Sequence, residues 1–351
     1  MHSYLQIPLW PFSQLYGGIM HFRNLGYDKG LLPSRQFGLP VIAVGNLTVG
    51  GTGKTPHVEY LLRLLHSYKV ATLSRGYKRQ SKGFILADAS ATTAILGDEP
   101  FQYHLDFKDV AVAVCEDRVK GIEQLQELVP NLQVVVLDDA MQHRPVQPSL
   151  NILITDYNRP FYVDYVLPAG RLREPRSGAR RADVVIVSKC PVGIGQQERE
   201  RILAQVQRYA LPNTPVFFST FAYGSPVAIG DAASFSKKKI VLLTGIANAE
   251  PLKVYLQEQG YTILEHLDFP DHHQYTRLDI DKLADLLQRP AFSGASVITT
   301  RKDAVKLTDK PLLPLTRNLP IFFVPIEVQF TEGGKRLDEL VLQHVQKRLQ
   351  G

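Results

Sequence analysis

A lysine and a hydroxyl at the end of a glycine-rich loop are the residues of this sequence most clearly placed to do chemistry. Residues 50–55 read GGTGKT, follow the apolar run at residues 41–45, and precede a helical pattern. Backbone N–H groups of such a loop, together with the positive end of a helix, can surround phosphate oxygens. The lysine then reaches the outer phosphates and the next hydroxyl binds magnesium. The loop predicts a nucleotide site with Lys54 and Thr55 at its end.

The predicted nucleotide contacts extend over the whole loop. The usual pattern, GxxxxGK followed by Ser or Thr, has glycine where this sequence has Thr48. The strand–loop–helix context still favours phosphate binding. The predicted contacts are Asn46, Thr48, Gly50, Gly51, Thr52, Gly53, Lys54 and Thr55.

A pair of carboxylates provides the expected partner for magnesium. In VVVLDDAMQHR, four apolar residues precede Asp138 and Asp139. Nucleotide-binding loops of this kind use a carboxylate at the end of a neighbouring buried strand to hold the metal. Two aspartates at a strand end could instead form a turn or a helix N-cap. The GGTGKT loop upstream favours the metal interpretation.

Further polar clusters are candidates for a second substrate. GDEP contains Asp98, which could accept a hydroxyl proton or could simply cap a helix. FPDHHQY contains His272 and His273, and a histidine paired with a catalytic carboxylate is favoured over a metal phosphoesterase, whose other motifs are missing. Arginines gather near predicted strand ends, where they could bind an anion by forked hydrogen bonds or form a solvated surface. They are Arg75, Arg79, Arg118, Arg171, Arg173, Arg176, Arg180 and Arg181.

Short apolar runs, rich in valine and isoleucine, must position these residues. Runs such as PVIAVGN, KVATLS, LQVVVLDDA and DVVIVSK are continuously apolar rather than alternating, with helical patterns between them. This pattern predicts an α/β fold with a mostly parallel sheet, a P-loop and helices on both faces. Polar residues follow the strand ends, at the edge where such sheets bind ligands. They are Gly45, Ser74, Glu116, Asp138, Asp156 and Lys189.

The chain divides near residue 224, after a stretch rich in Gly, Pro and Ser. A second α/β set follows, with runs KIVLLT, YTILEHLDF, ASVITT and IFFVPIEVQF. We expect an N-terminal amphipathic segment at 1–36, a P-loop core at 37–223, a smaller α/β domain at 224–326, and at 327–351 a C-terminal helix that can return to the core.

Composition limits the class of protein. A net charge of +6 over 351 residues suits an anionic partner or merely favours solubility. Cys115 and Cys190 lack metal-binding spacing and are expected to be reduced, in a cytoplasmic setting. No apolar run approaches the roughly 20 residues that span a bilayer, and no secretory signal pattern is present. The first segment has an apolar helical face next to cations, which indicates either an interfacial helix or a helix packed on its own core. That face comprises Phe12, Leu15, Tyr16, Ile19 and Met20, after Trp10.

Seven motifs, in this order and spacing, resemble those of the bacterial tetraacyldisaccharide 4′-kinases. They are GNLTVGGTGKTP, SRGY, GDEP, DDAMQHR, LPAGRLREP, DHH and TRKDAVK. The resemblance extends from the N-terminal helix to roughly residue 307, and Thr48 fits the family's own loop. Three residues depart from the family pattern: Ala140 and Met141 stand in a motif that usually reads DDGFQHR, and Arg171 stands where relatives often have proline.

The resemblance implies a reaction, cofactors and a place of action. The reaction is ATP- and Mg²⁺-dependent phosphorylation of the 4′-hydroxyl of an acylated glucosamine disaccharide 1-phosphate, which gives lipid IV-A in lipid A biosynthesis. Two domains would close around ATP. The N-terminal helix would bind the membrane surface at the cytoplasmic face of the bacterial inner membrane, as a peripheral contact, and no obligate protein partner is implied.

The resemblance also implies residue roles. Asp98 would accept the proton and His272 would orient it, with Lys54 on the phosphates and Thr55, Asp138 and Asp139 at the metal. Lys302 and Asp303 would lie near the nucleotide base or the ligand-binding cleft. The disaccharide phosphate would be lined by Arg75, Tyr77, Arg118, Gln142, His143, Arg171 and Glu174.

Two other classes of function remain open. One is a soluble P-loop ATPase or GTPase that acts as a switch or metallochaperone. Guanine recognition by (N/T)KxD is not expected, because Lys302 and Asp303 are adjacent and VSKCP lacks the aspartate. The other is a nucleic-acid-binding protein, but interleaved aromatics and recognised binding motifs are missing, so we expect no nucleic-acid partner.

Overall fold

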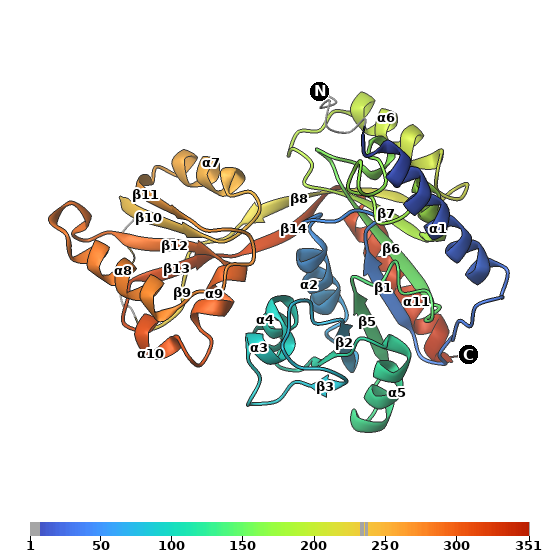
Figure 1. Ribbon diagram of the computed structural model, residues 1–351, viewed down its shortest axis with the longest axis horizontal. Helices are drawn as coiled ribbons and strands as arrows, with labels where there is room; N and C mark the ends of the chain where they lie inside the picture. The colour runs from blue at the N-terminus through green and yellow to red at the C-terminus, as the bar shows by residue number, and fades with distance from the viewer. Residues whose placement is uncertain (1–7, 232–234, 236–237, 351) are drawn as a thin grey trace.

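Two sheets, one of nine strands and one of five, form the two lobes of the molecule (Figure 1). The computed structural model describes residues 8–231, 235 and 238–350. The first seven positions of the predicted segment 1–36, five positions within 224–326 and the last position of 327–351 lie outside the described residues.

The larger sheet confirms the prediction of a mostly parallel α/β fold. All neighbours from β8 to β4 pair in parallel, and only the two edge strands, β14 and β3, run antiparallel. In spatial order the strands are β14 (Ile326–Glu332), β8 (Val216–Tyr223), β7 (Val184–Ser188), β6 (Leu150–Asp156), β1 (Val41–Gly45), β5 (Val134–Asp138), β2 (Val70–Ser74), β4 (Ala111–Val114) and β3 (Ile85–Leu86). The carboxyl ends of β1, β5 and β2 therefore lie side by side.

Alternate residues of the central strands pack against helices on opposite faces of this sheet. Val134 and Val136 of β5 share a core with α2 (Lys54–Leu64) and α11 (Gly334–Gln350), whereas Val135 and Leu137 share a core with α5 (Arg118–Leu128). α6 (Gln196–Gln207) packs against β6 and β7 in a third cluster. Burial on both faces explains the continuously apolar runs. The remaining helical elements of this lobe are α1 (Trp10–Asp28), α3 (Thr93–Leu96), α4 (Asp98–Asp106), and two 3-10 turns at Phe161–Val163 and Arg176–Arg181.

The smaller sheet is also mostly parallel. Its order is β11 (Thr262–Asp268), β10 (Lys239–Thr244), β12 (Ser296–Thr300), β13 (Ile321–Val324) and β9 (Val227–Ala228), with only β9 antiparallel to its neighbour. The helical elements of this lobe are α7 (Glu250–Glu258), α8 (Arg277–Gln288), α9 (Arg301–Leu307), α10 (Leu313–Thr316) and a 3-10 turn at Pro290–Phe292.

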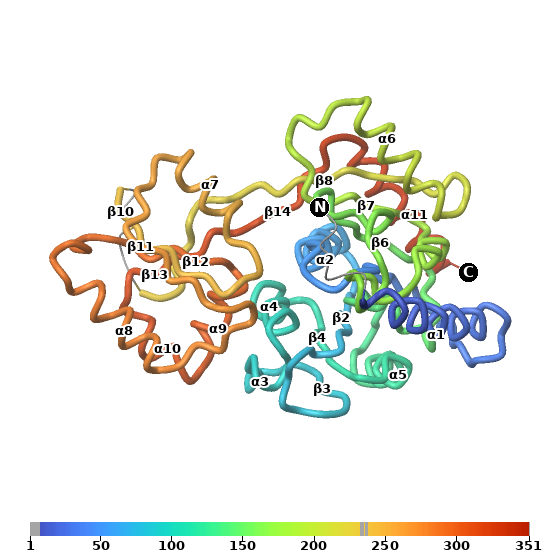
Figure 2. Tube along the Cα trace, turned by 45° about the horizontal axis from the view of Figure 1, so that its top comes forward, coloured from blue at the N-terminus to red at the C-terminus, as the bar shows by residue number. Residues whose placement is uncertain are grey.

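One apolar run contributes to both sheets. We predicted that IFFVPIEVQF belongs wholly to the second set, and for its second half this is wrong: β13 ends at Val324, and β14 begins at Ile326 and pairs with β8. Pro325 stands between them and has no N–H to donate to a ladder, while its carbonyl accepts from the Gly224 N–H at 2.9 Å. β8 and β14 thus form a two-stranded connection between the lobes (Figures 1 and 2). We propose that the lobes are two domains linked by this ribbon.

The lobes also touch through α4 and α9. Arg301 of α9 binds both carboxylate oxygens of Asp106 at the end of α4. The amide and hydroxyl of Thr93 donate to Asp309 at 2.9 and 2.6 Å. Val305 lies in one apolar cluster with residues of α3 and α4. This contact brings the start of α4 next to the second lobe.

Candidate active site

The glycine-rich loop connects β1 to α2 at the carboxyl edge of the larger sheet. Gly50 and Gly53 have φ of 102° and 90°, a conformation that glycine adopts at little cost. A Cβ on Gly53 would lie 2.7 Å from the Phe221 ring. The loop is further held by the Asn46 side-chain amide, which donates to the Thr52 hydroxyl at 2.9 Å. Backbone geometry therefore requires glycine at these two positions.

A second segment lies against the start of this loop. Arg173 N–H donates to the Leu47 carbonyl at 2.7 Å, and Val49 N–H donates to the Arg171 carbonyl at 2.8 Å. Thr48 is buried at this bridge, so its side chain supports the loop from within. The LPAGRLREP motif is thereby fixed beside the loop, with the Arg171 side chain exposed.

The two aspartates differ in their contacts. Asp138 ends β5, directly beside Val44 of β1, and its Oδ2 accepts from the Tyr103 hydroxyl at 3.1 Å. Its buried Oδ1 has no hydrogen-bond partner among the residues that the structure describes. Asp139 lies 3.4 Å from Lys54 Nζ and accepts from Arg173 Nη1 at 2.9 Å. An open, buried carboxylate oxygen beside the lysine of the loop is a fitting ligand for a hard cation such as Mg²⁺.

The two carboxyl groups also differ in acidity. Burial, and then the charge of Glu99, raises the pKa of Asp138 to about 7, against the opposing charge of Lys54. Burial acts in the same direction on Asp139, but Lys54 and Arg173 outweigh it and hold the pKa of this carboxyl below its usual value. A bound cation would therefore stabilise the ionised form of Asp138 more than that of Asp139.

The candidate base is Asp98, and the structure changes its setting. We expected a loop or a helix N-cap; instead Asp98 is the first residue of α4, and Gly97 occupies the N-cap position. Its Oδ2 lies 3.3 Å from Nδ1 of His272, which extends from the second lobe. Burial raises the pKa of Asp98, but the His272 hydrogen bond and the charges of Lys306 and Lys302 outweigh it, so the net shift is downward.

The structure distinguishes the two histidines. His272 has φ of 63° and faces Asp98. His273 faces its own lobe, where Nε2 lies 3.2 Å from Asp279 and the ring stacks on Phe269 at 4.4 Å between centroids. Only His272 is placed to act on Asp98.

Lys302 and Asp303 lie at the same contact between the lobes. Lys302 Nζ is 3.1 Å from Nε2 of His272 and 3.9 Å from Glu99. Asp303 has no exposed surface, and its Oδ2 accepts from the Gly245 N–H at 3.0 Å and the Thr300 hydroxyl at 2.8 Å. Asp303 is therefore placed to support its neighbours rather than to contact a nucleotide.

Of the residues expected to line the second substrate, Tyr77 lies beside the histidine that faces Asp98, and Arg118 and His143 contact each other. The Tyr77 ring is exposed and lies 5.6 Å from the His272 ring, and Arg75 is also exposed. Arg118 is buried, and its backbone N–H donates to Nε2 of His143 at 3.3 Å. Burial and the Arg118 charge lower the pKa of His143 to about 4, so this imidazole is neutral near pH 7.

Glu174 has a different environment from the one we predicted. It is 1% exposed and accepts from Asn24 at 2.7 Å, from Gln142 at 2.8 Å and from Arg181 at 2.8 Å. Gln142 also donates to the Asn46 carbonyl at 2.8 Å. Glu174 thus joins α1 to the residues beside the glycine-rich loop, and has no surface left for a ligand.

Two site residues were missed from sequence. Arg173 appeared among the arginines without a role, and Tyr103, which binds Asp138, was not selected at all. Nothing in the local sequence marks Tyr103, because its partner is 35 positions away.

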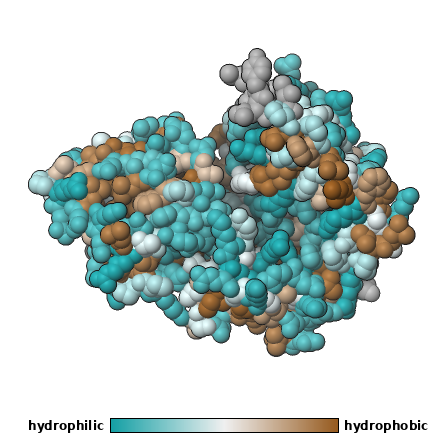
Figure 3. All heavy atoms as spheres, in the orientation of Figure 1, coloured by the Kyte–Doolittle hydropathy of each residue, from teal (hydrophilic) through white to brown (hydrophobic). Residues whose placement is uncertain are grey.

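Helix α1 exposes its apolar side and packs with its polar one. Ser13 and Asn24 are buried and hydrogen-bonded to Val166 and Glu174, and the Tyr16 hydroxyl donates to the Arg173 carbonyl. Tyr16, expected on the apolar face, therefore faces the protein. The exposed stripe consists of Phe12, Leu15, Ile19 and Phe22, which are 61%, 66%, 58% and 72% exposed. Figure 3 shows apolar residues gathered over this helix, and a hollow between the two lobes.

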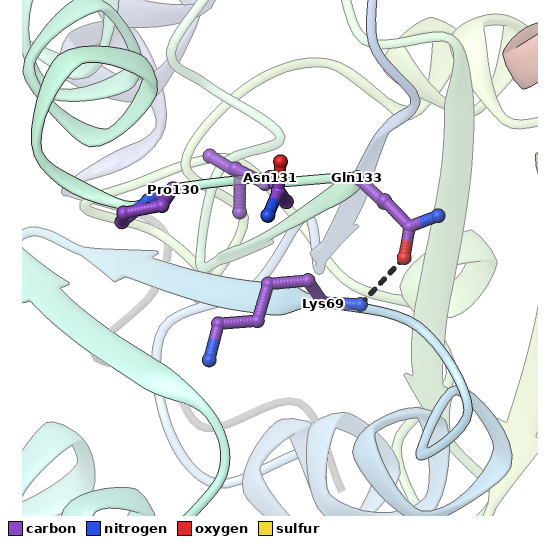
Figure 4. A pocket seen from close by; sticks show the side chains of 5 residues that line it. Lys69, Pro130, Asn131 and Gln133 are labelled. Atoms are coloured by element: carbon purple, nitrogen blue, oxygen red, sulfur yellow. Dashed lines mark hydrogen bonds between the residues drawn. The ribbon is translucent and has the colours of Figure 1, made fainter.

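A surface hollow on the opposite edge of the larger sheet does not include these groups. It is lined by Lys69, Pro130, Asn131, Leu132 and Gln133, and the Lys69 amide donates to the Gln133 side chain at 2.8 Å (Figure 4). Lys69 and Gln133 directly precede β2 and β5, whereas parallel sheets bind ligands at the carboxyl ends of their strands. The candidate site is the carboxyl edge.

Comparisons with known proteins show what the chain as a whole is similar to. The family described as "LpxK: Tetraacyldisaccharide-1-P 4′-kinase" matches residues 5–346. The chain is 43% identical to a tetraacyldisaccharide 4′-kinase of Cytophaga hutchinsonii, over 99% of this chain and 97% of that one. It is 44% identical to the protein of the same name from Phocaeicola vulgatus, over 94% and 92%. The crystal structure of LpxK from Aquifex aeolicus in complex with ATP is similar with a TM-score of 0.75 and 32% identity, over 97% of this chain and 99% of that one.

Proposed function

Because the chain belongs to the tetraacyldisaccharide-1-phosphate 4′-kinase family, we propose that the carboxyl edge of its larger sheet and the facing part of the second lobe form the active site of that reaction. The chain is an ATP- and Mg²⁺-dependent kinase that phosphorylates the 4′-hydroxyl of tetraacyldisaccharide 1-phosphate, a step of lipid A biosynthesis that gives lipid IV-A.

One observation supports this site above all: helix α4 contributes residues to both the acceptor side and the nucleotide side of the proposed site. Its first residue, Asp98, contacts His272, and Tyr103 on the same helix donates to Asp138 beside the glycine-rich loop. A base for the acceptor and a carboxylate for the nucleotide's metal are thus held by one rigid element. Phosphoryl transfer depends mainly on such positioning.

The proposed chemistry is in-line transfer. Asp98 accepts the proton of the 4′-hydroxyl while the hydroxyl oxygen forms a bond to the γ-phosphorus of ATP. At the same time the bond between the γ-phosphorus and the oxygen that leaves with ADP breaks. Lys54 and the N–H groups of the loop stabilise the charge that spreads over the transferred group. Thr55, Asp138 and Asp139 would hold Mg²⁺, which neutralises phosphate charge when bound.

The acceptor side of the site is proposed to be cationic. Arg75, Arg118 and Arg171 would bind the disaccharide phosphate by forked hydrogen bonds. Tyr77, Gln142 and the neutral His143 would complete this surface. Glu174, being buried and fully partnered, would act by holding Gln142 in place.

We also propose that α1 binds the membrane surface on the cytoplasmic side of the inner membrane. A substrate with four acyl chains leaves a bilayer at a cost of about 0.8 kcal/mol per methylene, so the enzyme must work at the interface. The exposed stripe of α1 suits such a contact. Within the described ranges, no helix has the length and apolar character needed to cross a membrane.

One incubation tests the function. The protein is mixed with ATP, Mg²⁺ and the acylated disaccharide 1-phosphate, and the lipid is analysed by mass spectrometry for the gain of one phosphate. If the rate of ATP hydrolysis does not depend on the lipid and the lipid gains no mass, the result would instead support a soluble ATPase.

A further inference from the structure

A lysine with no assigned role lies beside the proposed base. Lys306 of α9 is 2% exposed, and its Nζ lies 3.7 Å from Asp98 Oδ2 and 3.3 Å from Asp303 Oδ1. The Nζ also lies over the Tyr275 ring, 5.8 Å from its centroid. A buried ammonium destabilises a fold unless anions compensate its charge. Here the two anions come from different lobes, and one of them is the proposed base.

Asp303 fixes the position of this lysine. Its other oxygen is occupied by the Gly245 N–H and the Thr300 hydroxyl, so the carboxylate cannot rotate freely away from Lys306. The Gly245 carbonyl accepts from the His272 N–H at 3.1 Å. One backbone position therefore holds both groups that contact Asp98.

Both contacts are made to the same carboxylate oxygen. His272 Nδ1 and Lys306 Nζ each approach Asp98 most closely at Oδ2. This leaves Oδ1 as the oxygen that can meet a substrate hydroxyl.

We propose that Lys306 is a positioning residue of the phosphoryl transfer, a proposal that rests on the proposed role of Asp98 as the base. Anchored by Asp303, it gives the Asp98 carboxylate a fixed counter-charge and turns Oδ1 toward the acceptor. It does not contact either substrate and acts only through Asp98.

The proposal has a consequence for pH dependence. The charged groups that act on Asp98 are His272 from the loop before α8 and Lys302 and Lys306 from α9. Glu99 and Asp271 are the carboxylates beside Lys302, at 3.9 and 3.5 Å. Burial raises the pKa of Asp98, and the cations lower it. Loss of Lys306 removes one lowering influence, so the pKa of Asp98 rises and the acid limb of the activity profile moves to higher pH.

The test compares kcat across pH for the wild type and Lys306→Met. For Lys306→Met we expect the acid limb of the kcat profile to move to higher pH by about one unit. At the low-pH end of this limb kcat should fall about tenfold, whereas KM for ATP should change little. The matched control is Lys310→Met, which removes an exposed lysine whose ammonium donates to the Ala89 carbonyl across the same contact between lobes and is not among the charges that act on Asp98. This control should leave the profile unchanged.

Two further measurements keep the outcome decisive. Lys306→Met leaves Asp303 buried without its cation, so Lys306→Met with Asp303→Asn is measured as well and should show the same shift. A uniform loss of activity with an unmoved acid limb, or a normal profile, overturns the proposal. If neither variant folds, carboxyl ¹³C NMR of the wild type decides, because a pKa of Asp98 above the ordinary value contradicts a counter-charge and one below it agrees.

Asp98→Asn is measured in parallel to separate the two hypotheses. If it is inactive while Lys306→Met behaves as wild type, only the role of Lys306 fails. If Asp98→Asn is fully active, the base assignment itself fails, and the role of Lys306 with it.

Discussion

The Asp98 carboxylate lies 3.3 Å from the His272 imidazole, although 174 positions separate them and each belongs to a different lobe. The contact exists because α4 packs on α9. There the lobes are joined by an ion pair between Arg301 and Asp106 and by hydrogen bonds from Thr93 to Asp309. The proposed base and the histidine proposed to orient it are therefore brought together only when the two lobes are in contact.

Replacing the base should stop transfer without preventing nucleotide binding. Asp98→Asn keeps the shape of the side chain but is a far weaker proton acceptor, so we expect kcat to fall about a hundredfold or more. Lys54 and the loop are untouched, so ATP affinity should stay near that of the wild type. Lipid phosphorylation and ATP binding are measured separately. Asp109→Asn, an exposed aspartate after α4, is the control, and activity of Asp98→Asn close to it would dismiss the base.

The two histidines should respond differently. His272→Ala removes the hydrogen bond to Asp98, and we expect kcat to fall about tenfold to a hundredfold. In the Asp98→Asn background the same change should add little, because both act on one proton transfer. His273→Ala should keep kcat but lower the melting temperature, since its ring stacks on Phe269, a contact of about 0.5–1.5 kcal/mol. The reverse pattern would assign the role to His273.

Magnesium affinity should depend on pH near neutrality. The pKa of Asp138 is about 7 in the folded protein, above that of an aspartate in the unfolded chain. At pH values between these two pKa values, Asp138 therefore holds a proton in the folded state that it has lost in the unfolded state. Asp138 therefore contributes less to stability as pH rises toward 7. Mg²⁺ needs the ionised form, so its apparent affinity should fall up to about tenfold per pH unit below 7.

Calorimetry of Mg²⁺ with a non-hydrolysable ATP analogue, at pH 6 and 8, measures this effect. Asp138→Asn should bind the metal weakly at both pH values, with no proton release. Equal affinity of the wild type at pH 6 and 8 would show that Asp138 is not a ligand.

Glu174 should affect stability rather than substrate binding alone. Glu174→Ala leaves the buried Asn24 and the partly buried Gln142 and Arg181 without their acceptor, and breaking such a charged network around a buried carboxylate destabilises by about 3–5 kcal/mol. Urea unfolding and the melting temperature measure the loss. Glu200→Ala on the exposed side of α6 is the control and should change stability by less than about 0.5 kcal/mol. A stable Glu174→Ala with only a raised KM would restore the direct substrate role.

The stripe on α1 should determine membrane binding. Changing Phe12, Leu15, Ile19 and Phe22 together to serine removes four apolar groups that contribute about 1.5–3 kcal/mol each when fully buried. We expect the variant to stay in solution when vesicles of anionic phospholipid are floated, and to remain folded because these side chains are exposed. Leu278→Ser, 61% exposed on the second lobe, should float like the wild type. Unchanged flotation of the quadruple variant would exclude α1 as the contact.

Much of the fold and the phosphate site could be predicted because the relevant information is local. Continuously apolar runs indicated a sheet covered on both faces, and GGTGKT marked a strand–loop–helix turn in which Gly50 and Gly53 have positive φ. Since the strands are parallel, polar residues at their carboxyl ends had to share one edge, which brought Asp138 and Asp139 beside Lys54.

Only the tertiary structure decided the rest, because it depends on contacts that no sequence window contains. Pro325 divides one apolar run between two sheets, so β14 returns to β8, and this crossing sets how the lobes face each other. That packing selects His272 over His273, buries Asp303, and places Lys306 against Asp98. The sequence alone could name candidate acids, bases and cations, but their distances and burial follow from how the two lobes meet through α4 and α9, which local patterns do not encode.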